Sequence, residues 1–483
     1  MLESELYNKL LLEHSQEDVD KIFLEELQKR GIKDFNELIE FIENFEVEYD
    51  EKTIIKFVDI ASFFQLKIQE DLAKYLLEKY ILNQKYLDLI CNFHCIRYVI
   101  EELCKNNNQL NDEKILYMSS YVDILELNLF ENKYVTSNGL TNCVCLKILN
   151  ANNKYEIYSC EAFKNTILDI DASRNCGIGD SELKKCINLQ KLNASDNIKI
   201  TTCAPFANTL IKLGAWYNNA LYDQPRSFFC FRKPVYGIGD KGISKCVNLQ
   251  ELFADYNLNI TTCDPFAKSL IFLSAIYDSK LSDKGLKKCN KLEKLCAEGN
   301  PRITTCDPFA NSLLKITACD KFCGIGDKGL EKCINLQLLN ASNNPKITTC
   351  DPFCKSLTEL IASNWSGIRH FNHIYSFNNT GICGIGDEGL KNCINLRELN
   401  ADNNPKITTC EPFAKSLIVL HATYLSGIGD KGLKNCVNLQ RLNANRNEKI
   451  SSIEPFKNSI IELNMNYCSK LELEKCTKLK KNE

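Results

Sequence analysis

Apolar residues recur through most of the chain in a short pattern. Between Val122 and Cys476 the pattern is Leu-x-x-Leu-x-Ala, as in Leu396, Leu399 and Ala401. Apolar and polar residues that alternate over so few positions predict a short β-strand with one buried face. Two types of unit alternate. The first-type units begin at Leu146, Leu189, Leu249, Leu292, Leu336, Leu396 and Leu439, and the second-type units begin at Val122, Ile167, Leu210, Leu270, Leu313, Leu357, Leu417 and Ile460. The spacing therefore predicts about 15 stacked repeats over residues 121–476.

The segments between these strands carry signals for short helices. One kind reads GIGDKGLKNC, and we expect its Asp to cap a helix: Asp180, Asp240, Asp283, Asp327, Asp387 and Asp430. The other kind reads TTCDPFAKS, in which Pro suits the first helical position. The Phe that follows should fill the core: Phe163, Phe206, Phe266, Phe309, Phe353, Phe413 and Phe456. A repeated Asn marks where the chain turns away from each first-type strand and can bond neighbouring backbone groups: Asn153, Asn197, Asn257, Asn300, Asn344, Asn404 and Asn447.

The repeat resembles the leucine-rich repeat family in its cysteine-containing form, which occurs in F-box proteins and in repeat proteins of large DNA viruses. The family pattern Leu-x-x-Leu-x-Leu-x-x-Cys/Asn is matched here at Leu396, Leu399, Ala401 and Asn404, with Ala in place of the third Leu. The family's Ile-Thr-Asp becomes Ile-Gly-Asp. The resemblance implies an α/β fold, a leucine-rich-repeat solenoid shaped as a horseshoe with a parallel sheet on its concave face. A small, mainly α-helical N-terminal domain should precede it.

Residues 1–83 have helical periodicity, with an apolar stripe from Ile54 to Leu66. The order of helices resembles the C-terminal part of the BTB/POZ and Skp1 family. The residues that carry it are DF at 34–35, LIEFI at 38–42 and ASFFQL at 61–66. The chain has too few residues before Leu6 for the hairpin and helix that open that family, so a truncated domain is one interpretation. The alternative is a generic helical cap that covers the first repeat. Residues 84–120 predict a helical linker or cap, and residues 477–483 form a Lys-rich tail.

Composition narrows the class of function. The formal net charge of -3, from 59 basic and 62 acidic residues, argues against a general nucleic-acid-binding face. There is no basic leader and no apolar run long enough to span a membrane, and 26 cysteines indicate thiols in a reducing compartment. We therefore expect a cytoplasmic protein, in the host cytoplasm if the chain is viral.

The chemistry-bearing residues do not form a recognisable reaction centre. The GIGDKG segments match Gly-x-Gly-x-x-Gly but recur at the repeat period, which indicates turns and not dinucleotide binding. The pairs Cys319/Cys323 and Cys91/Cys95 lack a second pair for zinc. Fourteen cysteines instead take two fixed repeat positions, where Ile453 in one unit indicates a small apolar group. We expect no enzyme activity, no cofactor and no metal.

Aromatic residues on and just after the strands are the best indication of binding. First-type strands are mainly polar at the positions that face the concave side, whereas second-type strands place apolar and aromatic residues there. The candidate protein-binding residues are Trp216, Tyr217, Phe253, Tyr256, Phe272, Ile276, Tyr277, Trp365, His421 and Tyr424. Exposed aromatics on a curved sheet are typical of binding hot spots, but they can also fold over to cover the edge of the core.

Two units are interrupted at the same point. Leu210 and Gly237 are 27 positions apart, whereas Leu417 and Gly427 are 10 apart, so the insertion adds 17 residues. A second insertion of equal length follows Leu357. Both are aromatic-rich, and each is either a functional loop or one copy of a duplicated block.

These observations favour a protein–protein interaction module that binds a protein on its concave face. The N-terminal resemblance implies a substrate-recognition adaptor of a cullin-type ubiquitin ligase, with cullin or other ligase components contacting residues 1–120. The alternative is a non-catalytic scaffold or decoy that sequesters its partner.

Overall fold

The structure is a computed structural model, and it describes residues 110–120, 123–217, 237–364 and 382–465. Residues 1–83, with the BTB/Skp1 resemblance, lie outside the described residues, as do both insertions, Trp365 and the tail at 477–483. The chain divides into two compact units, Met1–Ile178 and Gly179–Glu483. Each unit is described by itself.

The described part of the first unit holds one helix and three parallel strands. Its elements are α8 (Asp112–Ser119), β1 (Glu126–Asn128), β2 (Ile148–Asn150), the 3-10 turn η1 (Glu161–Phe163) and β3 (Asp169–Asp171). Asn111 caps α8 by accepting a hydrogen bond from the Lys114 N–H at 3.0 Å. Ile115 and Met118 are buried, and the Asn132 amide donates to the carbonyl of Leu110 at 3.0 Å. The helix therefore closes the exposed end of the first strand, as a terminal cap does.

The first repeat begins at Ile124, so the prediction of Val122 was wrong by two residues. Strand β1 is centred on Leu127, and the residues that match Leu-x-x-Leu-x-Leu and are buried are Ile124, Leu127 and Leu129. Leu129 supplies the third apolar position, so the buried pattern begins two residues later than the prediction from Val122.

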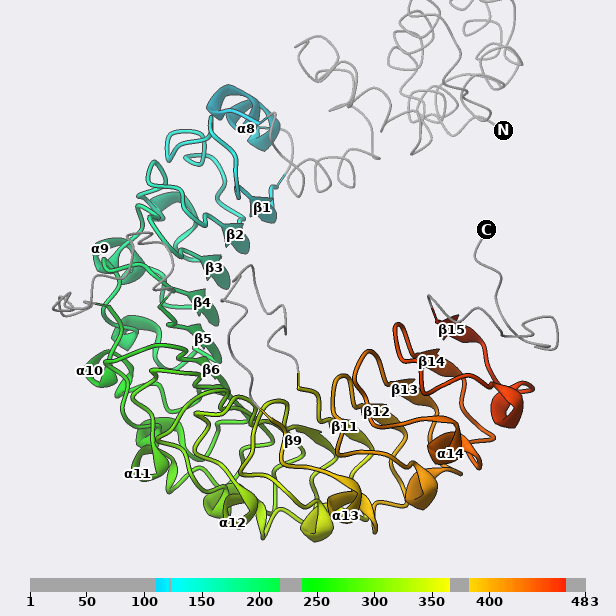
Figure 1. The fold of residues 1–483 in the computed structure, drawn as a ribbon. Helices are drawn as coiled ribbons and strands as arrows, with labels where there is room; N and C mark the ends of the chain where they lie inside the picture. The colour runs from blue at the N-terminus through cyan, green and yellow to red at the C-terminus, as the bar shows by residue number, and fades with distance from the viewer. Residues whose placement is uncertain (1–109, 121–122, 218–236, 365–381, 466–483) are drawn as a thin grey trace, which may run out of the picture. The chain divides into compact units, whose positions relative to one another are not determined.

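The second unit holds a twelve-stranded parallel sheet among its described residues, with the strands in chain order (Figure 1). The strands are β4 (Lys191–Asn193), β5 (Lys212–Gly214), β6 (Glu251–Phe253), β7 (Phe272–Ser274), β8 (Lys294–Cys296), β9 (Lys315–Thr317), β10 (Leu338–Asn340), β11 (Glu359–Ile361), β12 (Glu398–Asn400), β13 (Val419–His421), β14 (Arg441–Asn443) and β15 (Glu462–Asn464). Each strand pairs in register with the next, so Leu399 lies opposite Leu360 and Leu420.

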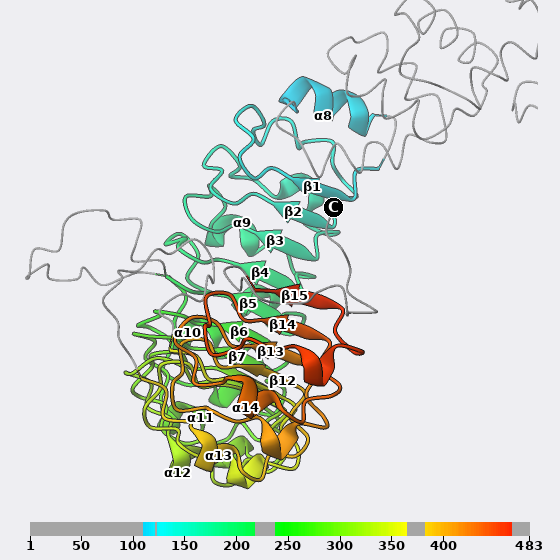
Figure 2. The ribbon, with the colours of Figure 1, turned by 45° about the vertical axis from the view of Figure 1, so that its right-hand side comes forward.

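One-turn helices complete each repeat on the side away from the sheet (Figures 1 and 2). The α-helices are α9 (Asp180–Leu183), α10 (Asp240–Ile243), α11 (Asp283–Leu286), α12 (Asp327–Leu330), α13 (Asp387–Leu390) and α14 (Asp430–Leu433). The 3-10 turns are η2 (Ala204–Phe206), η4 (Asp264–Phe266), η5 (Asp307–Phe309), η6 (Asp351–Phe353), η7 (Glu411–Phe413) and η8 (Glu454–Phe456). Pro is the second residue of each 3-10 turn, and the residue before the turn is Cys or Ile453.

The core is the one that the periodicity predicts. Leu396, Leu399 and Ala401 are all buried, and so are their equivalents in the other repeats except the last, where Leu463 and Met465 are half-buried. The seven predicted Phe residues are the largest fully buried side chains in the described part of the chain. The cysteines at the two fixed positions are also buried wherever the structure describes them. A hydrogen bond with Cys289 and burial both raise the pKa of the Cys263 thiol, which keeps that thiol protonated.

The aspartates of the GIGDKG segments do not cap their helices, contrary to the prediction. Gly386 occupies the cap position of α13, and Asp387 is the first helical residue. Its carboxylate instead accepts hydrogen bonds from the next repeat, from the Thr408 N–H at 2.8 Å and the Thr408 hydroxyl at 2.6 Å. The same pair of bonds joins each of the other five aspartates to the residue 21 positions further on. Each of these carboxylates therefore joins its own repeat to the next one through these hydrogen bonds.

The repeated Asn is buried and bonds backbone groups, as predicted. Asn404 donates to the carbonyls of Ala362 (2.7 Å) and Ile385 (3.2 Å) in the preceding repeat and accepts from its own turn. Asn153 was wrongly included in this set. It is one residue early, in a left-handed conformation at φ 59°, and the equivalent of Asn404 is the buried Lys154, whose Nζ donates to the carbonyl of Asn132 at 2.6 Å.

Candidate interaction surface

Two side chains of each strand flank the central buried residue and lie on the inner face of the sheet. In β7, Phe272 and Ser274 flank Leu273, and in β6, Glu251 and Phe253 flank Leu252. Because adjacent strands are in register, these residues form rows across the sheet. The composition of the rows therefore decides what the inner face can bind.

The inner face of β6 and β7 and the turns after them carry a cluster of apolar and aromatic side chains. We call Phe253, Tyr256, Phe272, Ile276 and Tyr277 the aromatic patch, and all five are half-buried. The rings of Phe253 and Phe272 lie 4.9 Å apart between centroids, at 43°. Lys212 Nζ lies 5.2 Å from the centroid of Phe253 and 2.9 Å from the carboxylate of Glu251. The structure thus brings together five of the predicted binding residues.

Tyr256 and Tyr277 extend the patch on the turns that leave the sheet. Their rings are stacked, with 5.3 Å between centroids and 19° between planes. The Tyr277 hydroxyl donates to Glu298 at 2.7 Å, and its ring lies over Gly299, where a Cβ would come within 2.6 Å of the ring. Burial, followed by the Glu298 carboxylate, raises the pKa of Tyr277, so the phenol stays protonated.

Both tyrosines have left-handed backbone conformations, at φ 55° for Tyr256 and 48° for Tyr277. Asn343 and Asn403 occupy the same turn position in other repeats, and Asn adopts this conformation more easily. The aromatic residues therefore stand where the backbone alone favours Asn or Gly.

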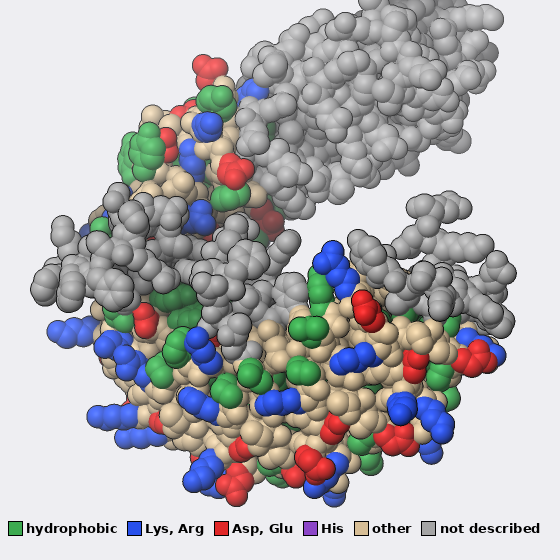
Figure 3. Space-filling model, in the orientation of Figure 1, with side chains coloured by type: hydrophobic (Ala, Val, Ile, Leu, Met, Phe, Trp, Pro, Cys, Tyr) green, Lys and Arg blue, Asp and Glu red, His purple; other side chains and the backbone are tan. Residues whose placement is uncertain are grey.

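Exposed lysines border the aromatic patch. Lys294 lies opposite Phe272 on the next strand, and Lys315 lies opposite Lys294. Neither forms an ion pair with any residue that the structure describes. Figure 3 shows Lys and Arg side chains interspersed with hydrophobic ones over this unit. The patch therefore offers aromatic contact area bordered by exposed lysines.

Two further predicted residues lie beside the first insertion. Trp216 is half-buried on the turn after β5. Tyr217 is only 8% exposed, and its hydroxyl occupies the space that a Cβ on Gly237 would need, at 1.7 Å. Burial raises the pKa of Tyr217 to about 12. Tyr217 therefore packs as part of the core edge and presents little surface for contact, which differs from the expectation.

His421 and Tyr424 are not part of the aromatic patch. His421 is on β13, six strands from β7 in the sheet order, and Tyr424 follows on the next turn. Arg446 lies 5.5 Å from the centroid of the Tyr424 ring. His421 and Tyr424 are thus separated from the other described candidate residues, which lie on β6 and β7 and on the turns after β5, β6 and β7.

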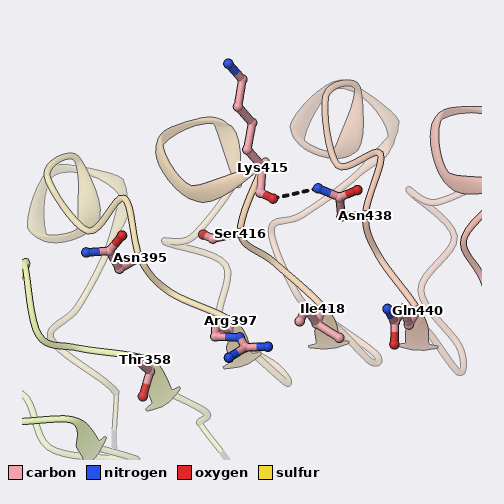
Figure 4. A pocket seen from close by; sticks show the side chains of 8 residues that line it. All are labelled: Thr358, Asn395, Arg397, Lys415, Ser416, Ile418, Asn438 and Gln440. Atoms are coloured by element: carbon pink, nitrogen blue, oxygen red, sulfur yellow. Dashed lines mark hydrogen bonds between the residues drawn. The ribbon is translucent and has the colours of Figure 1, made fainter.

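The inner face changes character towards β11 and β12. Glu359 and Glu398 lie opposite each other on these neighbouring strands. Burial and the Glu398 carboxylate raise the pKa of Glu359. A shallow groove of about 460 Å³ lies beside these strands, where they begin, and it is lined by Thr358, Asn395, Arg397, Lys415, Ser416, Ile418, Asn438 and Gln440 (Figure 4). The repeat pattern did not indicate this groove, although the lining residues hold fixed repeat positions.

In the ranges 110–120, 123–217, 237–364 and 382–465, no three His, Cys, Asp or Glu side chains gather as a metal site would require. Over the same ranges, none of the helices is long and apolar enough to traverse a lipid bilayer.

Comparison with known proteins adds fold-level likeness only. No protein-family model and no curated protein matches the chain. Among solved structures it is similar to an internalin of Listeria monocytogenes (19% identity, 76% of this chain and 94% of that one, TM-score 0.43). It is also similar to the yeast Rad7–Elc1 complex (14%, 82% and 97%, TM-score 0.38) and to a leucine-rich repeat protein of Leptospira interrogans (17%, 73% and 92%, TM-score 0.37).

The geometry itself defines the class of protein. Short parallel strands in chain order, a buried Leu-x-x-Leu-x-Ala face and one-turn helices on the far side make this an open leucine-rich-repeat solenoid.

Proposed function

We propose that the chain is a protein-interaction module and that the aromatic patch on β6 and β7 is the centre of its binding face. A single observation carries the proposal. Half-buried aromatic residues stand on the inner face and on left-handed turns, where most other repeats carry a polar residue or Gly. Such a conformation costs a Tyr on the order of 1 kcal/mol, so its retention favours a role for the ring.

The chemistry of the patch indicates the kind of partner. Aromatic rings provide large apolar contacts at the centre of an interface, and the bordering Lys294 and Lys315 favour carboxylates. We therefore propose a protein partner that presents an apolar side chain flanked by Asp or Glu.

The test uses substitutions that the repeat itself tolerates. Phe253→Asn copies Asn400 and Asn443 at the equivalent position, and Phe272→Lys copies Lys315. The double variant should keep the circular dichroism spectrum and lose more than about tenfold in affinity for the partner identified by wild-type affinity capture. Arg441→Lys, at the exposed inner-face position of β14 and seven strands from β7, is the matched control. Unchanged affinity in the double variant would refute the proposal.

A narrower proposal is that the chain is a substrate-recognition adaptor of a cullin-type ubiquitin ligase in the cytoplasm. It is supported by the resemblance of residues 1–83 to BTB/POZ and Skp1 proteins, and this warrant is an analogy. The deletion that tests it should end at residue 109, because α8 covers the first repeat. An adaptor without residues 1–109 would keep its partner but no longer promote the partner's ubiquitination. If no cullin or ubiquitin-ligase component is recovered with the full chain, the adaptor hypothesis is wrong.

The alternative is a non-catalytic scaffold or decoy that sequesters the same partner. A decoy without residues 1–109 would retain both binding and its effect on the partner. The deletion therefore distinguishes the two alternatives without changing the proposed binding face.

A further inference from the structure

A second surface of the molecule is periodic and exposed. In each first-type repeat, a β-branched apolar residue stands two positions before the first buried Leu. The one exception is Asn290. The equivalent residue in second-type units is Lys or Asn, except Val122 in the first of them. From β10 to β14 the two classes alternate strictly, and we call Ile334, Lys355, Ile394, Lys415 and Val437 the flank ridge. Ile334, Ile394 and Val437 are 58%, 60% and 54% exposed.

The fold does not require these side chains. The backbone beneath them is already bonded, since the carbonyl of Ile394 accepts from the Ser416 hydroxyl at 2.9 Å. The carbonyl of Lys415 likewise accepts from the Asn438 amide at 2.7 Å (Figure 4). Asn290 shows that a polar residue suits the same position. An exposed apolar row that the scaffold does not need is typical of a contact surface.

The flank ridge also carries unpaired cations. Lys355, Lys415 and the groove residue Arg397 form no ion pair with any described residue. Lysines on the outer side of the solenoid do so, as in Lys288–Asp264 at 2.7 Å and Lys332–Asp307 at 2.5 Å. The ridge and the groove beside it therefore favour an acidic ligand.

The spacing selects the conformation of that ligand. Neighbouring strands lie about 4.8 Å apart, so ridge residues of one class recur every ~9.6 Å. A polyproline II helix rises ~3.1 Å per residue with three residues per turn, so equivalent side chains recur every ~9.3 Å. An extended β-strand repeats its side chains every ~6.6 Å and an α-helix every ~5.4 Å. The polyproline II period matches the ridge most closely.

We propose that the flank ridge and the adjoining groove bind an acidic segment of a partner protein in polyproline II conformation, with a carboxylate at every third residue. Carboxylates one turn apart would lie beside Lys355 and Lys415, and Arg397 of the groove would add positive charge between them. The intervening residues would pack against Ile334, Ile394 and Val437. This surface lies outside the aromatic patch, so the inference goes beyond the proposed function.

The experiment measures the binding of dye-labelled peptides to the full chain by fluorescence anisotropy. The probe is a peptide of about four Pro-Pro-Glu triplets, and the controls replace the triplet by Pro-Pro-Lys or by the flexible Gly-Ser-Glu. The proposal predicts that Pro-Pro-Glu binds and that both controls bind at least about fivefold more weakly. Absence of Pro-Pro-Glu binding, or equal binding of Gly-Ser-Glu, would overturn it.

Variants then locate the site with residues that the repeat already uses. Lys355→Asn with Lys415→Asn, and separately Ile394→Asn, should each weaken the Pro-Pro-Glu peptide by about fivefold. Lys391→Asn with Lys434→Asn, the exposed residues that follow α13 and α14, is the charge-matched control for the double Lys variant. The Phe253→Asn and Phe272→Lys variant should bind the peptide as the wild type does. Equal loss in the Lys391 and Lys434 control would mean that the peptide responds to net charge alone, and the ridge would not be its site.

Discussion

Two regions of the second unit, β5–β8 and β11–β14, share one scaffold and differ in their surfaces. Both bury the same Leu, Ala, Phe and Cys positions and use the same Asn and Asp bonds between repeats. The first region departs from the repeat on its inner face, with the aromatic patch. The second region has carboxylates on its inner face and places its unusual feature, the alternating ridge, on the flank. The comparison shows that residues at the core positions of the repeat determine stability, whereas surface residues that differ from the equivalent residues of other repeats indicate binding.

The largest predicted effect tests whether the two scaffolds are equivalent. Phe309→Ala and Phe413→Ala each empty the same fully buried site, one near each region. Each should lower the free energy of unfolding by about 3–5 kcal/mol, because the removed ring leaves a cavity. Denaturant unfolding followed by circular dichroism measures both. A difference of more than about 2 kcal/mol between the two variants would show that the regions do not share one core.

The next effect concerns the bonds between repeats. Asn300→Ala and Asn404→Ala each leave buried backbone carbonyls of the preceding repeat without their donor. A loss of about 1–3 kcal/mol is expected for each. Asn403→Gly is the control, because Asn403 has φ 55° and glycine adopts that conformation freely. If the Asn403→Gly control were as unstable as Asn404→Ala, the buried amide of Asn404 would have no special role in stability.

A smaller effect separates binding from stability in the first region. Tyr256→Asn replaces a strained aromatic residue by the one found at Asn343 and Asn403. We expect stability to change by less than about 1 kcal/mol, since the relief of backbone strain offsets the lost ring stacking. Affinity for the partner should fall by about tenfold. If the free energy of unfolding fell by more than the free energy of binding, the Tyr256 ring would serve the scaffold and not the binding face.

The smallest effect belongs to the second region. The pKa of Glu359 is raised in the folded state, so folding favours its protonated form. Its charge therefore opposes folding at neutral pH, and this opposition disappears as the pH falls through the folded pKa. Glu359→Gln should stabilise the protein by at most about 0.5 kcal/mol at pH 7 and by less at acidic pH. Unfolding midpoints of both proteins at the two pH values measure the change, and a variant less stable than the wild type at pH 7 would contradict it.

The scaffold was predictable because each of its residues recurs at one period. Leu399, Phe413 and Asn404 were placed correctly, since a slip in one unit is visible against the others. The slip from Lys154 to Asn153 occurred where a neighbouring Asn offered a false match. The Asp387 bonds were missed because their donors lie in the next repeat, although the constant spacing of 21 residues to Thr408 was available.

The surface was less predictable because it depends on single departures from the repeat. The stack of Tyr256 on Tyr277 requires the turn conformations of two successive units. The burial of Tyr217 depends on Gly237, which follows an insertion in the sequence. The flank ridge was overlooked because one Ile beside a buried Cys resembles a core residue, and only its exposure in several repeats identifies it.

The most direct test of the binding face is site-specific photo-crosslinking in cells. A photoreactive phenylalanine analogue is placed at Phe272 in the aromatic patch and, in a second protein, at the exposed position of Lys391 on the outer side. The account predicts that one protein is crosslinked through position 272 and not through position 391. Crosslinking of that same protein from position 391 alone, or equally from both positions, would contradict it.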